Sequence, residues 1–253
     1  MTGRAAVGPS ALRIVSLFPS LLGTYGDGGN AVVLAQRCRW RGIDVELIQV
    51  DPHDTVPQDA DVYLLGGGED GAQTAAADAL QVTLADRAPL ARAVARGAQL
   101  LAVCAGLQLV GNVFCDAAGA RTRGLGLIDL TTTRLQARAV GEVLALPQPD
   151  LELPPLSGFE NHAGSTALGS TVRALAVVQR GVGNGAADDR GRGLEGAVTP
   201  NVIATYLHGP VLARNPALAD LLIARATGTT RQSLAPLIVP EHAALRRSLG
   251  VAG

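Results

Sequence analysis

Apolar residues in the first half of the chain gather in short runs, which are separated by segments rich in polar residues or glycine. Short, mostly uninterrupted apolar runs are typical of strands that are buried on both faces. We predict strands at residues 12–18, 44–50, 61–68 and 98–104. Two segments between them carry apolar residues at helical spacing, and we predict helices at 30–41, with Asn30 as its cap, and at 85–96.

The pattern changes from Gly124 onward, where the chain breaks into short β-like pieces such as residues 124–130, 138–146 and 158–166. A helical pattern returns at Pro216–Ala226, and the last segment contains one more amphipathic stretch, EHAALRRSL. We therefore predict three parts. A flexible N-terminus covers residues 1–11, a single α/β domain covers 12–228, and a helical tail covers 229–253.

The alternation of strands and helices predicts a parallel sheet with helices on both faces. The fold class is α/β: a flavodoxin-like three-layer sandwich with a mostly parallel central sheet. Ligands of such sheets bind beyond the carboxyl ends of the strands. The glycine run Gly66, Gly67 and Gly68 follows the third predicted strand, and Cys104 ends the fourth. Both features therefore belong to the edge where a ligand is expected.

The stretch LLAVCAGLQLVG places Cys104 between a buried strand and a helical segment. A buried cysteine often serves only as a small hydrophobic residue. A cysteine at a strand-to-helix turn can also be a nucleophile elbow, in which the sulfur is exposed above the sheet edge. The position of the glycine run at the same edge favours the nucleophile.

Composition excludes several function classes. The net charge is −1 and no basic cluster is present, which argues against a nucleic-acid partner. All 21 basic residues are arginine, so no lysine is available for a phosphate-binding Walker loop. No run approaches the ~18 apolar residues of a membrane span. The three cysteines lack disulfide-like spacing and the four histidines lack metal-ligand spacing, so we expect a cytoplasmic protein without a metal.

A thiol nucleophile needs a base, and His208 in ATYLHGP is the first candidate because it ends a strand-like run. His162 in GFENHAGST, which is also flanked by small residues, is the alternative. A lone histidine in either place is more often structural than catalytic.

Five motifs in order give the chain a resemblance to a known family: TYGDGGN, LLGGGED, AVCAGLQLVG, GFENHAG and TYLHGPVLARNPALAD. Together they resemble the class I glutamine amidotransferases, and within them the GatD type, the glutaminase subunit of lipid II isoglutaminyl synthase. The glutaminase domains of cobyric acid synthases share the cysteine and the HG ending. The resemblance runs from about Leu12 to Ala226.

The resemblance implies that Cys104 attacks the side-chain amide of L-glutamine and that His208 transfers the proton. Backbone N–H groups of Ala105 and of the Gly66–Gly68 loop would then stabilise the oxyanion, and Arg138 would bind the carboxylate of glutamine. No cofactor is implied for this chain. ATP would be bound by a Mur-ligase-like partner, MurT, in a heterodimer that amidates the D-glutamate of lipid II to D-isoglutamine in peptidoglycan biosynthesis.

One departure from the family concerns the partner of the histidine. Many class I enzymes have a glutamate two residues after it, and this chain has Pro210 there. Proline cannot orient an imidazole, so either a dyad suffices or another residue replaces the glutamate. Asp27 is the first candidate and Glu160 the second, although aspartate before Gly28 and Gly29 is also typical of a plain turn.

Three other functions remain open on the sequence alone. The chain could amidate a cobalamin precursor with the same chemistry and another partner. It could be a non-catalytic binding or regulatory subunit, a reading that the missing glutamate supports. It could also be a cysteine peptidase or γ-glutamyl hydrolase with a wider pocket at the same site.

Overall fold

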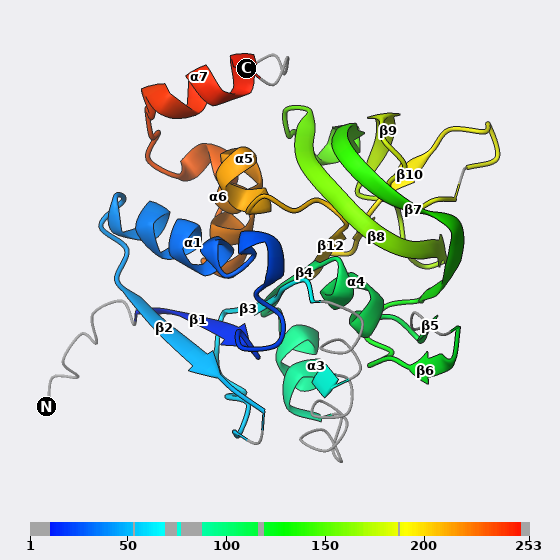
Figure 1. The fold of residues 1–253 in the computed structure, drawn as a ribbon. Coiled ribbons are helices and arrows are strands. Elements are labelled where there is room, and N and C mark those ends of the chain that lie inside the picture. The colour runs from blue at the N-terminus through cyan, green and yellow to red at the C-terminus, as the bar shows by residue number, and fades with distance from the viewer. Residues whose placement is uncertain are drawn as a thin grey trace, which may run out of the picture.

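The computed structural model of the chain describes residues 11–52, 54–68, 75–76, 88–115, 119–186 and 188–248. In these residues the strands form two six-stranded sheets (Figure 1). The central sheet has the order β11-β12-β4-β3-β1-β2 and is parallel apart from β11. Its strands are β1 (Leu12–Leu17), β2 (Val45–Val50), β3 (Val62–Leu65), β4 (Gln99–Val103), β11 (Ala197–Val198) and β12 (Val202–Thr205).

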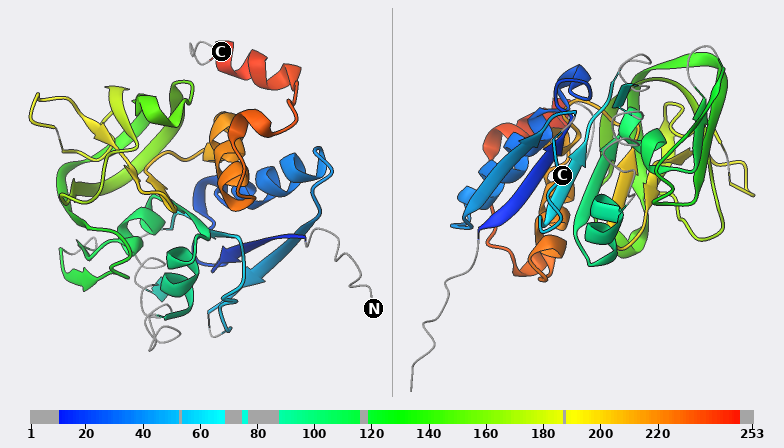
Figure 2. Two further views of the ribbon diagram at one scale, coloured as in Figure 1. Left: turned by 180° about the vertical axis from the view of Figure 1, so that it is seen from behind. Right: turned by 90° about the horizontal axis from the view of Figure 1, so that it is seen from below.

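Helices cover both faces of the central sheet. On one face lie α1 (Gly29–Arg39), α5 (Val211–Arg214) and α6 (Pro216–Ala226), and on the other lie α3 (Ala88–Ala95) and α4 (Ala105–Val110), as the views in Figure 2 show. The predicted α/β sandwich with a mostly parallel central sheet is thereby confirmed. Strands β3 and β4 are buried along their whole length, which explains their continuous apolar sequence.

The short β-like pieces of the second half join into longer strands than their sequence indicates. The second sheet has the order β10-β9-β7-β5-β6, with β8 also paired to β7. Its strands are β5 (Val113–Cys115), β6 (Arg121–Arg123), β7 (Leu130–Pro147), β8 (Leu156–Leu168), β9 (Ala176–Arg180) and β10 (Leu194–Glu195). One face of β7 is solvent-exposed and a bulge interrupts it between Arg134 and Ala139, so its apolar pattern breaks into fragments.

The start of α1 differs from the prediction. The helix begins at Gly29 after Gly28, and no side chain caps it. The side-chain oxygen of Asn30 instead accepts a hydrogen bond from the N–H of Leu212 at 3.0 Å. Asn30 therefore joins the start of α1 to α5 instead of capping the N-terminus of its own helix.

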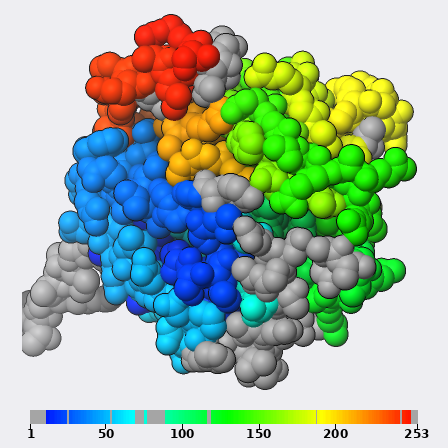
Figure 3. Space-filling model, in the orientation of Figure 1, coloured from blue at the N-terminus to red at the C-terminus, as the bar shows by residue number. Residues whose placement is uncertain are grey.

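The predicted tail contains two elements, a 3-10 turn (Arg231–Ser233) and α7 (Pro240–Ser248). Figure 3 shows α7, in red, lying against the orange α5–α6 segment. The predicted flexible N-terminus lies almost entirely outside the described residues, as does the first part of the predicted helix at 85–96. None of the described helices is both long and apolar enough to cross a membrane.

An ion pair between α1 and α6 holds the helical layer together. Arg37 donates two hydrogen bonds to Asp220, from Nε at 2.8 Å and from Nη2 at 2.7 Å, and Arg41 approaches the same carboxylate at 3.0 Å. The side chains of Arg37, Arg41 and Asp220 are 9%, 4% and 14% exposed. Removal of one member of such a largely buried pair is costly, because it leaves the other charge uncompensated.

Replacing Asp220 by asparagine should test this ion pair. The change keeps the size of the side chain but leaves the largely buried guanidinium of Arg37 without its anion. We expect the free energy of unfolding to fall by about 3 kcal/mol, as measured by urea denaturation. A loss below about 1 kcal/mol would mean that the pair behaves like an exposed surface pair.

Candidate active site

Cys104 lies at the junction between β4 and α4, in a strained backbone conformation with φ of +51° and ψ of −102°. A positive φ is unusual for a residue with a side chain and persists only where the surrounding structure enforces it. The N–H of Cys104 donates to the carbonyl oxygen of Thr205 at 2.8 Å. A Cβ on Gly106 would lie only 2.6 Å from the carbonyl oxygen of Leu65, so α4 packs directly on β3. This is the geometry of a nucleophile elbow.

The other two cysteines lie in different surroundings. Cys38 is fully buried on α1, and burial raises the pKa of its thiol to about 11. Such a thiol is a poor nucleophile at neutral pH. Cys115 is half-buried on β5, in the second sheet.

His208 follows β12 and is 1% exposed. Its main chain forms a two-bond bridge with Phe159 on β8, which fixes the residue between the two sheets. Its ring nitrogen Nδ1 lies 2.9 Å from Oδ2 of Asp27, and its side chain also interacts with that of Cys104. Because Nδ1 faces Asp27, Nε2 is the nitrogen that remains for the sulfur.

Asp27 follows the 3-10 turn Thr24–Gly26 and is 4% exposed. Its Oδ2 atom accepts a second hydrogen bond from the N–H of Gly67 at 2.8 Å. A Cβ on Gly67 would come within 2.5 Å of His208 Cε1 and 2.8 Å of Asp27 Oδ2. Glycine is therefore required at position 67, where the loop, the carboxylate and the imidazole meet.

The surroundings of His208 favour its protonated form. Burial lowers the pKa of the imidazole, but its hydrogen bond with Asp27 and its interaction with the side chain of Cys104 outweigh burial and raise that pKa from 6.5 to about 10. The imidazole is therefore cationic at neutral pH in the resting site.

Pro210 contacts the same loop that carries Asp27. A Cβ on Gly29 would lie 2.5 Å from Cγ of Pro210, so the proline ring rests directly on the glycine turn. The bond from Leu212 to Asn30 holds the two segments together on the other side. The residue that replaces the family's glutamate thus packs on the turn that supplies Asp27.

The alternative residues Glu160 and His162 form a separate buried pair. Glu160 accepts the N–H groups of Val182 and Gly183, each at 2.8 Å, and lies 3.4 Å from His162 Nε2. The ring of His162 stacks on Tyr206 with the centroids 3.7 Å apart. The carboxylate that faces His208 is accordingly that of Asp27.

The residues expected to bind the substrate are only partly brought together. Gly66 accepts the N–H of Gly106 at 3.2 Å, which places the glycine loop beside the start of α4 and therefore beside Ala105. Arg138 is exposed on β7, in the bulge, and donates to Asn161 Oδ1 at 2.6 Å. Sequence reasoning missed Asn161. It also missed Thr205, whose only sequence signal is a polar residue inside an apolar strand.

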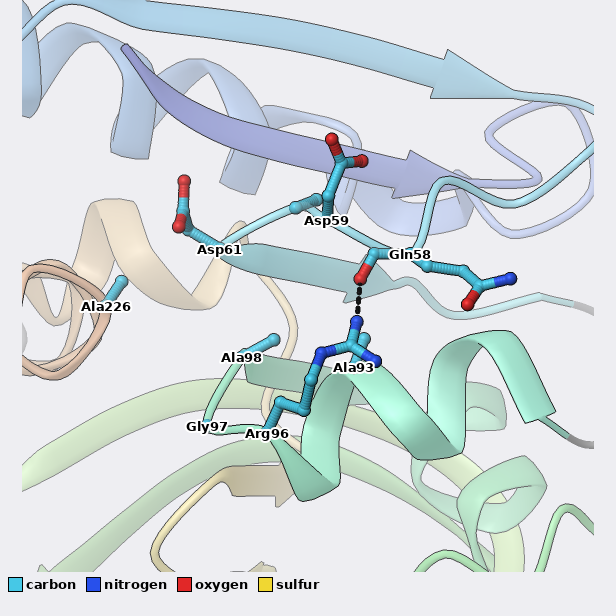
Figure 4. Close-up of a pocket in the computed structure, with 9 residues that line it drawn as sticks. Gln58, Asp59, Asp61, Ala93, Arg96, Gly97, Ala98 and Ala226 are labelled. Atoms are coloured by element: carbon cyan, nitrogen blue, oxygen red, sulfur yellow. Dashed lines mark hydrogen bonds between the residues drawn. The ribbon is translucent and has the colours of Figure 1, made fainter. Parts of the chain in front are cut away.

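A second concave feature lies away from this site. A cavity of about 240 Å³ lies beside the residues that precede β3 and β4, the sheet edge opposite Cys104. Asp59, Asp61 and Arg96 contribute to it, and Arg96 donates to the carbonyl oxygen of Gln58 (Figure 4). Its lining contains no cysteine or histidine, so it offers neither a thiol nucleophile nor an imidazole base.

Comparisons with known proteins agree with this geometry. Over 220 residues the chain is 33% identical to the GatD subunit of lipid II isoglutaminyl synthase (glutamine-hydrolyzing) of Streptococcus pneumoniae, covering 86% of this chain and 81% of that protein. The same subunit of Staphylococcus aureus is 31% identical over 85% of this chain and 84% of its own length. Cobyric acid synthase of Sphingopyxis alaskensis is also 31% identical, over 72% of this chain but 35% of its own length.

The fold is shared with a solved glutamine amidotransferase from Thermotoga maritima, with a TM-score of 0.54 and 12% identity over 95% of this chain and 96% of that one. Residues 13–216 match the model of the CobB/CobQ-like glutamine amidotransferase domain. A cysteine at a nucleophile elbow with a histidine beside it is suited to amide hydrolysis. The chain belongs to the CobB/CobQ-like glutamine amidotransferase family.

Proposed function

We propose that this chain is the glutaminase subunit of a lipid II isoglutaminyl synthase, which releases ammonia from L-glutamine at Cys104 for use by a partner subunit. The observation that carries the proposal is the contact of His208 with both Cys104 and Asp27 at a nucleophile elbow. The similarity to GatD over most of both chains supports the choice of reaction.

The three side chains suit the hydrolysis of an amide through a thioester. The Cys104 thiolate attacks the side-chain carbonyl of glutamine, and the His208 imidazolium gives its proton to the nitrogen that leaves as ammonia. Water then attacks the thioester while the neutral imidazole accepts its proton. Glutamate leaves, and the thiolate and imidazolium are restored. Asp27 holds the ring with Nε2 toward the sulfur throughout.

The oxyanion needs donors that are not already used. The N–H of Gly67 is committed to Asp27, which leaves those of Ala105, Gly66 and Gly68 as the proposed donors. One such donor typically lowers a barrier by ~3 kcal/mol. We assign Arg138 to the carboxylate of glutamine because a guanidinium matches a carboxylate with two parallel bonds, and Asn161 orients it.

We further propose that a Mur-ligase-like partner of the MurT type binds ATP, activates the D-glutamate of lipid II and receives the ammonia, in a cytoplasmic heterodimer. Hydrolysis of glutamine by this chain needs no cofactor in this scheme. The absence of lysine agrees with this division of labour, because a Walker loop cannot be formed without it. Amidation of a cobalamin precursor is less well supported, since the similarity spans only 35% of that cobyric acid synthase.

Reconstitution with a Mur-ligase-like partner from the same genome tests the proposal. With ATP, Mg²⁺, lipid II and glutamine, we expect mass spectrometry to show the D-glutamate carboxylate converted to an amide. The Cys104→Ala variant should lose this product with glutamine but form it normally with an ammonium salt. Formation of the product from glutamine by the Cys104→Ala complex would contradict the proposal. So would a wild-type complex that forms the product from an ammonium salt but not from glutamine.

The role of Asp27 is tested by Asp27→Asn, which keeps the shape but weakens the acceptor for His208. We expect kcat for glutamine hydrolysis to fall at least tenfold, or ~1.4 kcal/mol of barrier, with the fold retained by circular dichroism. The matched control is Glu160→Gln, because that carboxylate binds Val182 and Gly183 instead; its kcat should change less than threefold. Equal effects of the two changes would argue that Asp27 is only a turn residue.

A further inference from the structure

Glu195 is a buried carboxyl group that the scheme above does not use. It ends β10, at the point where the chain crosses from the second sheet to β11 of the central sheet. The crossing is fixed by Asn184, whose side chain accepts the N–H of Gly196 at 2.7 Å and donates to its carbonyl oxygen at 2.9 Å. The Glu195 side chain is held in one place beside the end of β12.

Two hydrogen bonds tie the Glu195 side chain to the segment that leads to His208. Its Oε1 atom accepts the hydroxyl of Thr205 and the N–H of Tyr206, the latter at 3.1 Å. The Thr205 hydroxyl in turn accepts the N–H of Leu207 at 3.1 Å. One carboxylate oxygen therefore organises the three residues that precede His208.

The same segment holds the nucleophile, because the carbonyl oxygen of Thr205 accepts the N–H of Cys104 at 2.8 Å. We propose that Glu195 is a positioning residue of the glutaminase site, which fixes the sulfur of Cys104 and the imidazole of His208 against each other through Thr205. The expected effect on kcat for glutamine hydrolysis rests on the proposed function. The geometry around Thr205 does not depend on the substrate.

The surroundings of Glu195 are unfavourable for a charged carboxylate. It is fully buried, and no ion pair to it is present among the described residues. Burial, with a further contribution from Glu160, raises the pKa of its carboxyl group to about 7. Its Oε2 atom is buried without a hydrogen-bond partner in the described structure. A proton on Oε2 leaves Oε1 as the acceptor, so the proposed role needs the oxygen and not the charge.

Steady-state kinetics of Glu195→Gln and Glu195→Ala separate positioning from charge. The Glu195→Gln variant keeps an acceptor oxygen for Thr205 and Tyr206, and its kcat should stay within threefold of the wild type. The Glu195→Ala variant removes the acceptor, and its kcat should fall at least tenfold while its KM for glutamine changes less than threefold. Asp220→Asn is the control, because it destabilises a distant helix pair and should leave kcat unchanged.

A second pair of variants covers the case in which Glu195→Ala does not fold. Thr205→Val keeps the volume of the side chain but removes the hydroxyl, and it should lower kcat at least fivefold. Thr205→Ser keeps the hydroxyl and should restore kcat to within twofold of the wild type. The inference is overturned if Thr205→Val has the kcat of the wild type and every Glu195 variant that folds does too.

Alkylation of Cys104 by iodoacetamide at pH 7 gives a readout that does not require glutamine. Relative to alkylation of Cys115 in the same sample, the rate at Cys104 should fall at least fivefold in Thr205→Val and remain near normal in Glu195→Gln and Thr205→Ser. If alkylation of Cys104 slows in Thr205→Val but the wild-type protein has no glutaminase activity, the proposed function is rejected and the inference stands. Normal alkylation of Thr205→Val beside an active wild type would reject the inference alone.

Discussion

The hydrogen bond between Asp27 and His208 is the interaction on which the site depends. It joins residues 181 positions apart, one from the turn after the first strand and one from the end of β12. The carboxylate also takes the N–H of Gly67, so the glycine loop is aligned by the same atom that orients the imidazole. Both bonds go to Oδ2, and charge-assisted contacts of this kind are stronger than neutral ones. The turn of Asp27, the glycine loop and the end of β12 thereby meet at one oxygen atom.

The strained backbone of Cys104 is the second constraint, and it is held from two sides. Strand β12 supports the cysteine through the carbonyl oxygen of Thr205, and strand β3 supports the following turn through the close contact of Gly106 with Leu65. A residue at positive φ relaxes unless its neighbours prevent it. The buried Glu195 bonds to Thr205 and extends this support into the second sheet.

The sequence was informative where a function depends on the order of elements. Apolar runs that end in glycines, cysteine and histidine predict groups at one sheet edge, and Asp27 follows because the first strand ends at the same edge. The β7–β8 pair was not predictable in full, because one face of β7 is exposed and a bulge breaks its alternation. The contacts of Asn161 with Arg138 and of Glu195 with Thr205 depend on how strands pair and cross between the two sheets, which leaves no local sequence pattern. The packing of Pro210 on Gly29 is likewise visible only in the folded structure.

The most direct test of the account is an NMR titration of the His208 imidazole in ¹⁵N-histidine-labelled protein. The account predicts that the ring stays doubly protonated through neutral pH and titrates near pH 10, because Asp27 and Cys104 stabilise the cation. In the Asp27→Asn variant the midpoint should move down toward the ordinary histidine value of about 6.5. A wild-type ring that titrates near that ordinary value, with no change in the variant, would contradict the proposed arrangement of Cys104, His208 and Asp27.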